Sequence, residues 1–367
     1  MPTSARPDMR GEIDVEALGL FQYRLFSTLQ GAVTAGLVHL GDRLGLYAGL
    51  AESAHPQTSA DLAARTGLDE RWVREWAYNQ GAAELIVVDP ATERLSLTPE
   101  AAAVLGAPDH EAFGLGEFVQ LPHYLASLPT LAESFRTGVG HNYDSHGAEG
   151  AIGLERTFEP WNSHHLVPDV LPALDGLTDA LATGIGVADI GCGAGGAVLM
   201  MAAAYPNSRF IGYDISRHAL DRASVRVAES GLTNAQFADP RDEPLPDDHS
   251  LGLVTMFDCL HDMSHPQEMA NAVRASLADD GAWLLCDIKA LDTYGQNVER
   301  NPMAALMYGF SVLSCMSSGL SEPGGAGLGT LGMSESKARE IATNAGFARF
   351  RRLAIDHPTD VFYEIRP

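Results

Sequence analysis

The sequence predicts an α/β protein, in which a Rossmann-like sheet of seven strands follows a smaller, mostly helical domain. Three observations lead to this prediction. A short apolar strand at 187–190 breaks into glycines and continues as a helix of small residues, as at the first turn of a doubly wound sheet. Apolar strands then alternate with helical segments. Near the N-terminus, two short helices precede a hairpin, which is the pattern of a winged helix.

The N-terminal elements follow from caps and periodicity. We expect disorder over residues 1–10, and then a helix from Asp14 to about Gly41 with apolar residues on one face. A short helix capped at Thr58 ends at Gly67, and a second helix covers 69–79. The hairpin strands are predicted at 85–88 and 94–98. The apolar face of the first helix consists of Leu18, Phe21, Leu25 and Leu29. We expect three regions: a winged-helix domain at 1–105, a helical linker and active-site cover at 106–180, and a ligand-binding domain at 181–367.

The charge of the chain disfavours nucleic acid and anionic membrane as partners. Its net charge is −24, and its only lysines are Lys289 and Lys337. From Thr58 to Glu100 there are four arginines against eight acidic residues, which is a poor footprint for phosphates. No apolar run is long enough to span a bilayer. A small, neutral or cationic substrate is therefore favoured, and a winged-helix DNA regulator is the less favoured alternative.

The cysteines and the N-terminus indicate a cytoplasmic protein. The four cysteines form no C-x-x-C pair, and the N-terminus carries no basic-then-apolar signal. We therefore expect free thiols in a reducing compartment.

The run from Val187 to Ala197 is the most informative motif. Glycines at 191, 193 and 195 remove the Cβ atoms where the backbone passes a ligand, and Asp189 lies at the carboxyl end of the strand. A dinucleotide site and a glycine-rich turn without ligand are the alternatives. Asp189 would repel a pyrophosphate, whereas it suits a cation. The pattern acidic-x-Gly-x-Gly-x-Gly resembles the class I methyltransferases, which bind S-adenosylmethionine, a sulfonium without phosphate.

Two further strand ends extend this resemblance. Asp214 closes the strand 209–215 about twenty residues after the glycines, where a carboxylate accepts ribose hydroxyls. With Ile215 it is expected at the nucleoside, although Asp214 could instead cap the next helix. Asp239 closes the segment 235–239. The resemblance implies that it binds the adenine amino group, and a turn aspartate before Pro240 is the alternative.

The fourth and fifth strands carry the candidate chemistry. Phe257 and Asp258 end the fourth strand and are expected near the methionine part of the donor. The following run, Leu260-His261-Asp262, resembles O-methyltransferases with a winged-helix domain, in which the histidine removes the proton of the acceptor. A packing or hydrogen-bonding histidine is the alternative. Asp287, on the strand 282–288, falls where the plant enzymes orient that histidine, or it is a water-exposed strand end. The second flanking acid of the plant pattern has no counterpart here, which argues against a phenolic substrate.

Two helical segments supply candidate substrate residues. Over nearly its whole length the chain resembles winged-helix proteins of the mycobacterial Rv2258c type, in which the segment 106–180 covers the donor site. This implies that Tyr143, Trp161 and His165 line the pocket. On the predicted helix 301–316, the polar candidates are Tyr308, Ser311 and Cys315. The histidines of the covering segment fit no zinc spacing, so no metal is expected.

The last two strands, 348–355 and 360–365, are too close in sequence for a crossover and are predicted to pair antiparallel. A terminal antiparallel hairpin on a parallel sheet is typical of the methyltransferase topology. We therefore expect methyl transfer from S-adenosylmethionine to an oxygen, nitrogen or carbon of a small molecule. The resemblance also implies a homodimer. An enzyme that uses the same cofactor for lyase or cyclisation chemistry is the alternative.

Overall fold

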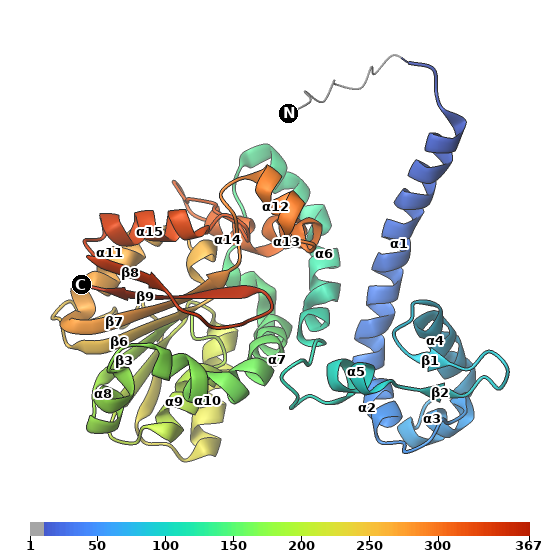
Figure 1. The fold of residues 1–367 in the computed structure, drawn as a ribbon, viewed down its shortest axis with the longest axis horizontal. Coiled ribbons are helices and arrows are strands. Elements are labelled where there is room, and N and C mark those ends of the chain that lie inside the picture. Colours follow the sequence, from blue (N-terminus) through green and yellow to red (C-terminus); the bar gives the residue numbers. More distant parts are fainter. Residues whose placement is uncertain (1–10) are drawn as a thin grey trace. The chain divides into compact units, whose positions relative to one another are not determined.

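A single mixed sheet organises the larger part of the molecule. The computed structural model describes residues 11–367, so the first ten residues, for which we expect disorder, lie outside the described part. The chain divides into two compact units, Met1–Gly106 and Ala107–Pro367, which are described separately (Figure 1).

The sheet of the second unit has seven strands in the order β5-β4-β3-β6-β7-β9-β8. All neighbouring strands are parallel except β9, which is antiparallel to both β7 and β8. The predicted fold class and the terminal hairpin are thereby confirmed. The strands are β3 (Gly186–Ile190), β4 (Arg209–Tyr213), β5 (Ala235–Ala238), β6 (Leu251–Phe257), β7 (Leu277–Ile288), β8 (Arg349–Arg352) and β9 (Asp360–Arg366).

The central position of β3 determines where a ligand can bind. It lies between β4 and β6, so the strand order reverses here, and open α/β sheets bind ligands at the carboxyl ends of such strands. In register, Asp189 pairs with Gly212 on one side and with Thr255 on the other. The loops after β3, β4 and β6 therefore meet at one edge of the sheet.

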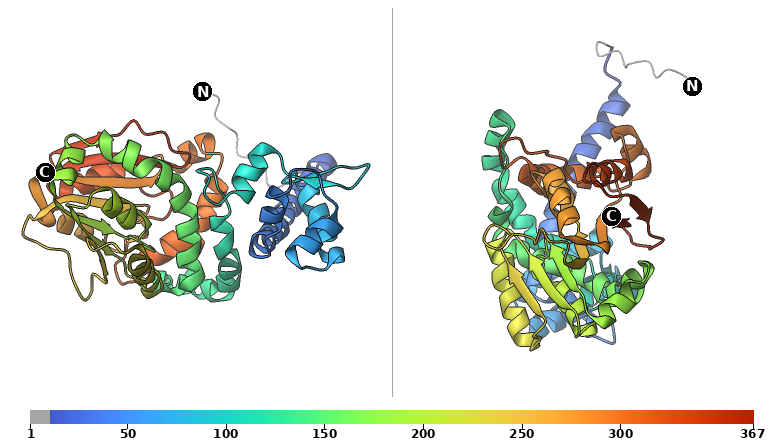
Figure 2. Two further views of the ribbon diagram at one scale, coloured as in Figure 1. Left: turned by 90° about the horizontal axis from the view of Figure 1, so that it is seen from below. Right: turned by 90° about the vertical axis from the view of Figure 1, so that its left-hand side faces the viewer.

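Helices cover both faces of the sheet and bury an apolar core on each (Figure 2). On one face the core includes Trp283 of β7 with residues of α11 and α15. On the other it includes Leu284 with residues of α8 and α9. The alternation along β7 follows from the two-residue period of a strand. These helices and α10 are α8 (Leu177–Thr183), α9 (Gly196–Ala204), α10 (Arg217–Ser230), α11 (Pro266–Ser276) and α15 (Glu335–Asn344).

Two further helical segments complete this unit. The first precedes β3, and its long helix α7 packs on α6, α9 and α10. It contains α6 (Gly116–Thr137), η2 (Tyr143–His146), α7 (Gly147–His165), η3 (Leu166–Val170) and η4 (Leu171–Ala173). The second lies between β7 and α15. It contains α12 (Tyr294–Arg300), α13 (Ala304–Phe310), η6 (Ser311–Cys315) and α14 (Met316–Gly319). A short turn, η5 (Leu260–Asp262), follows β6.

The first unit consists of a long helix, short helices and a hairpin. The capping box at Thr58 and Asp61 starts α3, and Gly67 ends it at φ 69°. Asp14 and Asp69 cap α1 and α4, as their positions before apolar runs predict. The elements are α1 (Val15–Arg43), α2 (Leu46–Ala51), α3 (Ser59–Thr66), α4 (Glu70–Ala82), β1 (Val87–Val88), β2 (Leu95–Ser96), α5 (Pro99–Ala101) and η1 (Ala102–Gly106).

Two elements differ from their sequence-based prediction. The strand predicted at 282–288 begins earlier, at Leu277, and the register of β7 with β6 jumps from Leu277 to Ala282, so the residues between them bulge out. The helix predicted over 301–316 divides into α13, η6 and α14, with the wide turn of a π-helix in the middle. Within residues 11–367, no helix combines the length and apolarity that a membrane span requires.

Candidate active site

The glycine loop after β3 is shaped for a ligand. Gly191, Gly193 and Gly195 have φ of 71°, 55° and 80°, values that glycine adopts without strain. A Cβ on Gly191 would lie 2.6 Å from Cβ of Cys259, and one on Gly195 would lie 2.4 Å from the ring of Phe237. By contrast, a Cβ on Gly193 would meet nothing within 4 Å. The first and third glycines therefore serve close packing, while the second borders open space.

Two buried carboxyl groups flank this loop. Asp189 is 2 % exposed, and its Oδ1 accepts a hydrogen bond of 2.6 Å from the Thr255 hydroxyl. Burial raises its pKa to about 7, against the opposing effect of that hydrogen bond. Asp214 accepts the N–H of Gly193 at 2.8 Å and the N–H of Ser216 at 2.7 Å. Burial raises its pKa as well, because these backbone bonds compensate only partly for lost hydration.

The next strand ends differ in accessibility. Ile215 is 44 % exposed beside Asp214. Asp239 is bound by Arg241, whose Nε lies 2.8 Å from its Oδ1, and this pairing lowers the pKa of the carboxyl. An adenine amino group at Asp239 would thus have to share the carboxylate with Arg241.

Phe257 ends β6. Asp258 follows at φ 49°, an unusual value for a residue other than glycine, and its N–H donates to the carbonyl of Cys286 at 3.0 Å.

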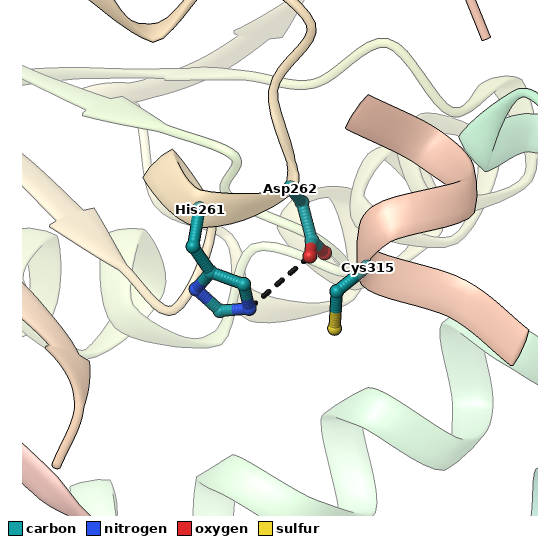
Figure 3. Close-up of side chains that lie close together, drawn as sticks. All are labelled: His261, Asp262 and Cys315. Carbon is teal, nitrogen blue, oxygen red and sulfur yellow. Dashed lines mark ion pairs between the residues drawn. The ribbon is translucent and has the colours of Figure 1, made fainter. Parts of the chain in front are cut away.

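His261 lies between two carboxylates on the other side of the loop. Its Nδ1 is 2.8 Å from Oδ1 of Asp287. Its Nε2 is 3.1 Å from Oδ1 of Asp262 (Figure 3). Burial alone would lower the pKa of His261, but Asp287 and Asp262 outweigh it and raise the pKa well above its ordinary value. Asp287 is fully buried and also accepts the N–H of Ile288. The two carboxylates therefore favour the protonated form of the imidazole.

Cys315 of η6 approaches the same pair, as Figure 3 shows. His261, Asp262 and Cys315 present ligand atoms within 4.8 Å of one another, a donor set that zinc accepts in proteins. Burial raises the pKa of the Cys315 thiol to about 11, and its sulfur accepts the hydroxyl of Thr330 at 2.9 Å. In the structure described here, these side chains are joined by contacts to one another and to Thr330.

Tyr143 is near both Asp214, at the glycine loop, and Asp262, beside His261. Burial raises the pKa of its hydroxyl well above the ordinary value, and the nearby carboxylates of Asp262 and Asp214 raise it further. Its ring contacts His146 edge to face, with the ring centroids 5.1 Å apart. The structure thus brings Tyr143 and Cys315 together with His261 and Asp262.

The other sequence-predicted substrate residues make contacts of their own. Trp161 stacks on His165 at 4.6 Å and also contacts His357. His165 is bound by Glu111 and Asp169 at 2.6 and 2.7 Å. On α13, Tyr308 packs near Tyr294. Ser311 is buried against Gly329, where a Cβ would lie 2.1 Å from its hydroxyl oxygen.

Sequence reasoning missed His146 and Tyr124. His146 is buried, its Nε2 lies 3.0 Å from Oγ of Ser314, and burial lowers its pKa to about 4, so it is neutral. Tyr124 of α6 packs against it with a centroid distance of 5.9 Å. The density of histidine and tyrosine in the covering segment is the only signal in the sequence for this cluster.

Comparisons with known proteins agree with both units. Residues 188–283 match a family model described as a methyltransferase domain, and residues 32–107 match an Rv2258c-like winged HTH domain. A protein of Rickettsia prowazekii (strain Madrid E), Uncharacterized protein RP789, is 34 % identical over 76 residues. That match spans 21 % of this chain and 13 % of the other protein.

Solved structures share the fold over nearly the whole chain. Mitomycin 7-O-methyltransferase MmcR has a TM-score of 0.68 at 17 % identity, covering 96 % of this chain and 99 % of its own. Human N-acetylserotonin methyltransferase in complex with SAM has a TM-score of 0.66 at 17 % identity, covering 97 % and 99 %. The O-methyltransferase NcsB1 from neocarzinostatin biosynthesis, in complex with S-adenosyl-L-homocysteine and 1,4-dihydroxy-2-naphthoic acid, has a TM-score of 0.59 at 18 % identity, covering 97 % and 99 %. At such identities the likeness establishes the fold alone.

Proposed function

We propose that the chain is an S-adenosylmethionine-dependent methyltransferase with an N-terminal winged-helix domain, and that it methylates a small molecule on oxygen, nitrogen or carbon. One observation carries this proposal. Cys259, two residues before His261, packs against Gly191 and donates its thiol to the carbonyl of Ile190, so the glycine loop and the His261 side adjoin. A methyl donor and its acceptor need this adjacency, because the reacting atoms must lie in line.

The residues at the sheet edge fit the donor. The open space at Gly193 leaves room for a ligand against the loop, and Asp214 lies directly beside it. In the proposal Gly191, Gly193 and Gly195 adjoin the methionine part, Asp214 and Ile215 hold the ribose, and Asp239 holds the adenine. Phe257 and Asp258 border the methionine end, and Asp189 contributes negative charge. When bound, S-adenosylmethionine supplies an electrophilic methyl group.

His261 is our candidate for the general base. To act as one, its Nε2 must lose its proton and turn from Asp262 to the acceptor hydroxyl, while Nδ1 keeps its bond to Asp287. Asp287 then stabilises the imidazolium that forms. Tyr143 and Cys315 border the acceptor on this side, and Ser311, Tyr308, Trp161 and His165 are further substrate candidates.

We also infer that the protein forms a homodimer through α1. Large apolar side chains of this helix are exposed on more than one side: Phe21 at 63 %, Tyr23 at 73 % and Phe26 at 67 %. A helix that is apolar around its circumference requires burial, and a second copy of the chain can provide it. The free state of all four cysteines supports a cytoplasmic location. The acidic surface supports a small-molecule acceptor rather than nucleic acid.

Titration calorimetry tests the proposal directly. S-adenosylmethionine and S-adenosylhomocysteine should each bind the full-length chain with one site per protomer, and NAD should not bind. Incubation of the donor with candidate hydroxy and amino compounds should produce S-adenosylhomocysteine together with a product heavier by one methylene unit. Binding of NAD in place of the sulfonium nucleoside would refute the assignment, and consumption of the donor without S-adenosylhomocysteine would favour lyase or cyclisation chemistry.

A further inference from the structure

A small cavity lies beside the end of β6, and Asp258 in its wall also lies within 4.8 Å of His261 and Asp287. Its volume is about 70 Å³, several times what one water needs. It is bounded by α7, by the end of β6, by β7 and by the start of β9. Its side chains include four aromatic rings, Phe158, Trp161, Phe257 and Phe362, and two carboxyl groups, Asp258 and Asp360.

The two carboxyl groups have unused hydrogen-bonding capacity. Oδ1 of Asp258 and Oδ1 of Asp360 are both inaccessible to water, and neither has a donor partner. Asp360 is only 3 % exposed. Burial raises the pKa of both groups, and their mutual proximity raises that of Asp258 further. Without a cation, two such groups can avoid repulsion only by sharing a proton.

The nearest basic side chain is paired with other carboxylates. His261 lies within 4.8 Å of Asp258 and lowers the pKa of both aspartates, but its Nδ1 and Nε2 contact Asp287 and Asp262. His357 borders the cavity, but its Nδ1 accepts the N–H of Asp360 at 2.9 Å, and burial lowers its pKa to about 4, so it is uncharged. The ammonium group of Lys289 is bound to the backbone carbonyl of His357. Of the residues that the structure describes, neither a lysine nor an arginine borders the cavity.

The walls distinguish an organic cation from a metal ion. Asp258, Cys286 and Asp360 place ligand atoms within 4.8 Å of one another. Burial raises the pKa of the Cys286 thiol well above its ordinary value, which disfavours the thiolate form that metal ions bind. A hard divalent ion prefers six or more oxygens, many of them water, which four aromatic rings do not supply. Aromatic faces do attract organic ammonium groups.

We propose that this cavity binds a small ammonium group, which Asp258 and Asp360 receive as hydrogen-bonding acceptors and Trp161 and Phe257 enclose. An ammonium offers three N–H donors, and the two unpartnered Oδ1 atoms match two of them. Two sources of this group exist: the α-ammonium of the donor's methionine part, and an aliphatic amine on the acceptor. The assignment to either source rests on the proposed function, whereas ammonium binding by the cavity does not.

Asp360→Asn is the central variant, because it removes the charge and keeps the shape of the side chain. Asp356→Asn is its matched control, since it removes the same charge from an exposed position of the same loop. The ligands are S-adenosylhomocysteine, which carries the α-ammonium, and 5′-methylthioadenosine, which lacks the amino-acid part. Methylammonium chloride, with potassium chloride as the ionic control, probes the cavity alone by saturation-transfer NMR.

Either of two results supports the proposal. If the donor supplies the ammonium, Asp360→Asn lowers the affinity for S-adenosylhomocysteine at least tenfold and leaves the affinity for 5′-methylthioadenosine unchanged. Asp356→Asn changes neither affinity. If the acceptor supplies it, the S-adenosylhomocysteine complex of the wild type still binds methylammonium, and Asp360→Asn abolishes that binding. Should Asp360→Asn fail to fold, Asp258→Asn is measured in its place.

The proposal is overturned if Asp360→Asn changes neither the relative affinity for the two nucleosides nor the binding of methylammonium. It is also overturned if Zn²⁺ or Mg²⁺ binds in an Asp360-dependent manner while methylammonium does not. Failure of the wild type to bind either nucleoside would instead refute the proposed function, and methylammonium binding would still test the cavity by itself.

Discussion

Nδ1 of His261 lies 2.8 Å from Oδ1 of Asp287, and water reaches neither side chain. Asp287 comes from β7 and His261 from the turn η5 after β6, so the pairing depends on the register of two parallel strands. The pKa of His261 therefore depends on how β6 pairs with β7, because this pairing places Asp287 beside the imidazole.

Replacing Asp287 with asparagine should shift the pH dependence of the reaction. Asp287 raises the pKa of His261, so its loss lowers that pKa and allows the neutral imidazole to exist at lower pH. If His261 is the base, the acidic limb of the kcat profile moves to lower pH, while the maximal rate falls because the ring is less well oriented. A profile that keeps its midpoint would exclude His261 from the titration.

His261→Ala should lower kcat by roughly two to four orders of magnitude without weakening donor binding. His261→Gln provides a second variant that keeps a polar side chain, and His164→Ala, at an exposed position of α7, is the control for loss of an imidazole. Donor affinity measured by calorimetry shows whether each variant is folded. A rate near that of the wild type would assign His261 a structural role.

Asp214→Ala should abolish donor binding. The carboxylate lies at the proposed ribose position and also accepts the N–H groups of Gly193 and Ser216, so its loss removes a ligand contact and loosens the loop. Calorimetry with S-adenosylhomocysteine measures the effect. Asp221→Asn, which removes a charge from an exposed position of α10, should bind normally. Unchanged affinity in Asp214→Ala would place the ribose elsewhere.

The affinity for S-adenosylmethionine should rise with pH around neutrality. Burial raises the pKa of Asp189 to about 7, so the group gains its negative charge as the pH passes that value. A sulfonium favours the charged carboxylate, and the gain is at most tenfold per pH unit. S-adenosylhomocysteine, which has no sulfonium, should depend less on pH. Asp189→Asn should reduce the difference between the two ligands, and an equal pH dependence for both would contradict this role.

Phe21→Asp and Leu25→Asp should each convert the proposed dimer to monomers. Both residues are 63 % exposed on α1, and an acidic side chain there would have to be buried unpaired in an interface. Sedimentation velocity gives the mass, with Ala60→Asp, an exposed position of α3, as the control for the added charge. A monomeric wild type would refute the inference about α1.

The fold could be predicted from the sequence because its signals are local. The caps at Asp14, Thr58 and Asp69, and the alternation of strands with helices, each involve residues a few positions apart. The site depends on contacts between distant segments, which periodicity does not encode. Neither the approach of Cys315 to His261 and Asp262 nor the contact of His146 with Ser314 could be inferred from spacing alone.

The strand β9 spans Asp360–Arg366 and lies between β7 and β8. During synthesis, β8 emerges before β9, which is its neighbour in the sheet. A chain truncated before Asp360 lacks both the inner strand and a wall of the cavity. Such truncated products would expose the apolar edge of β7 to aggregation or to proteolysis. Synthesis of β9 is thereby a structural requirement for the pocket as well as for the sheet.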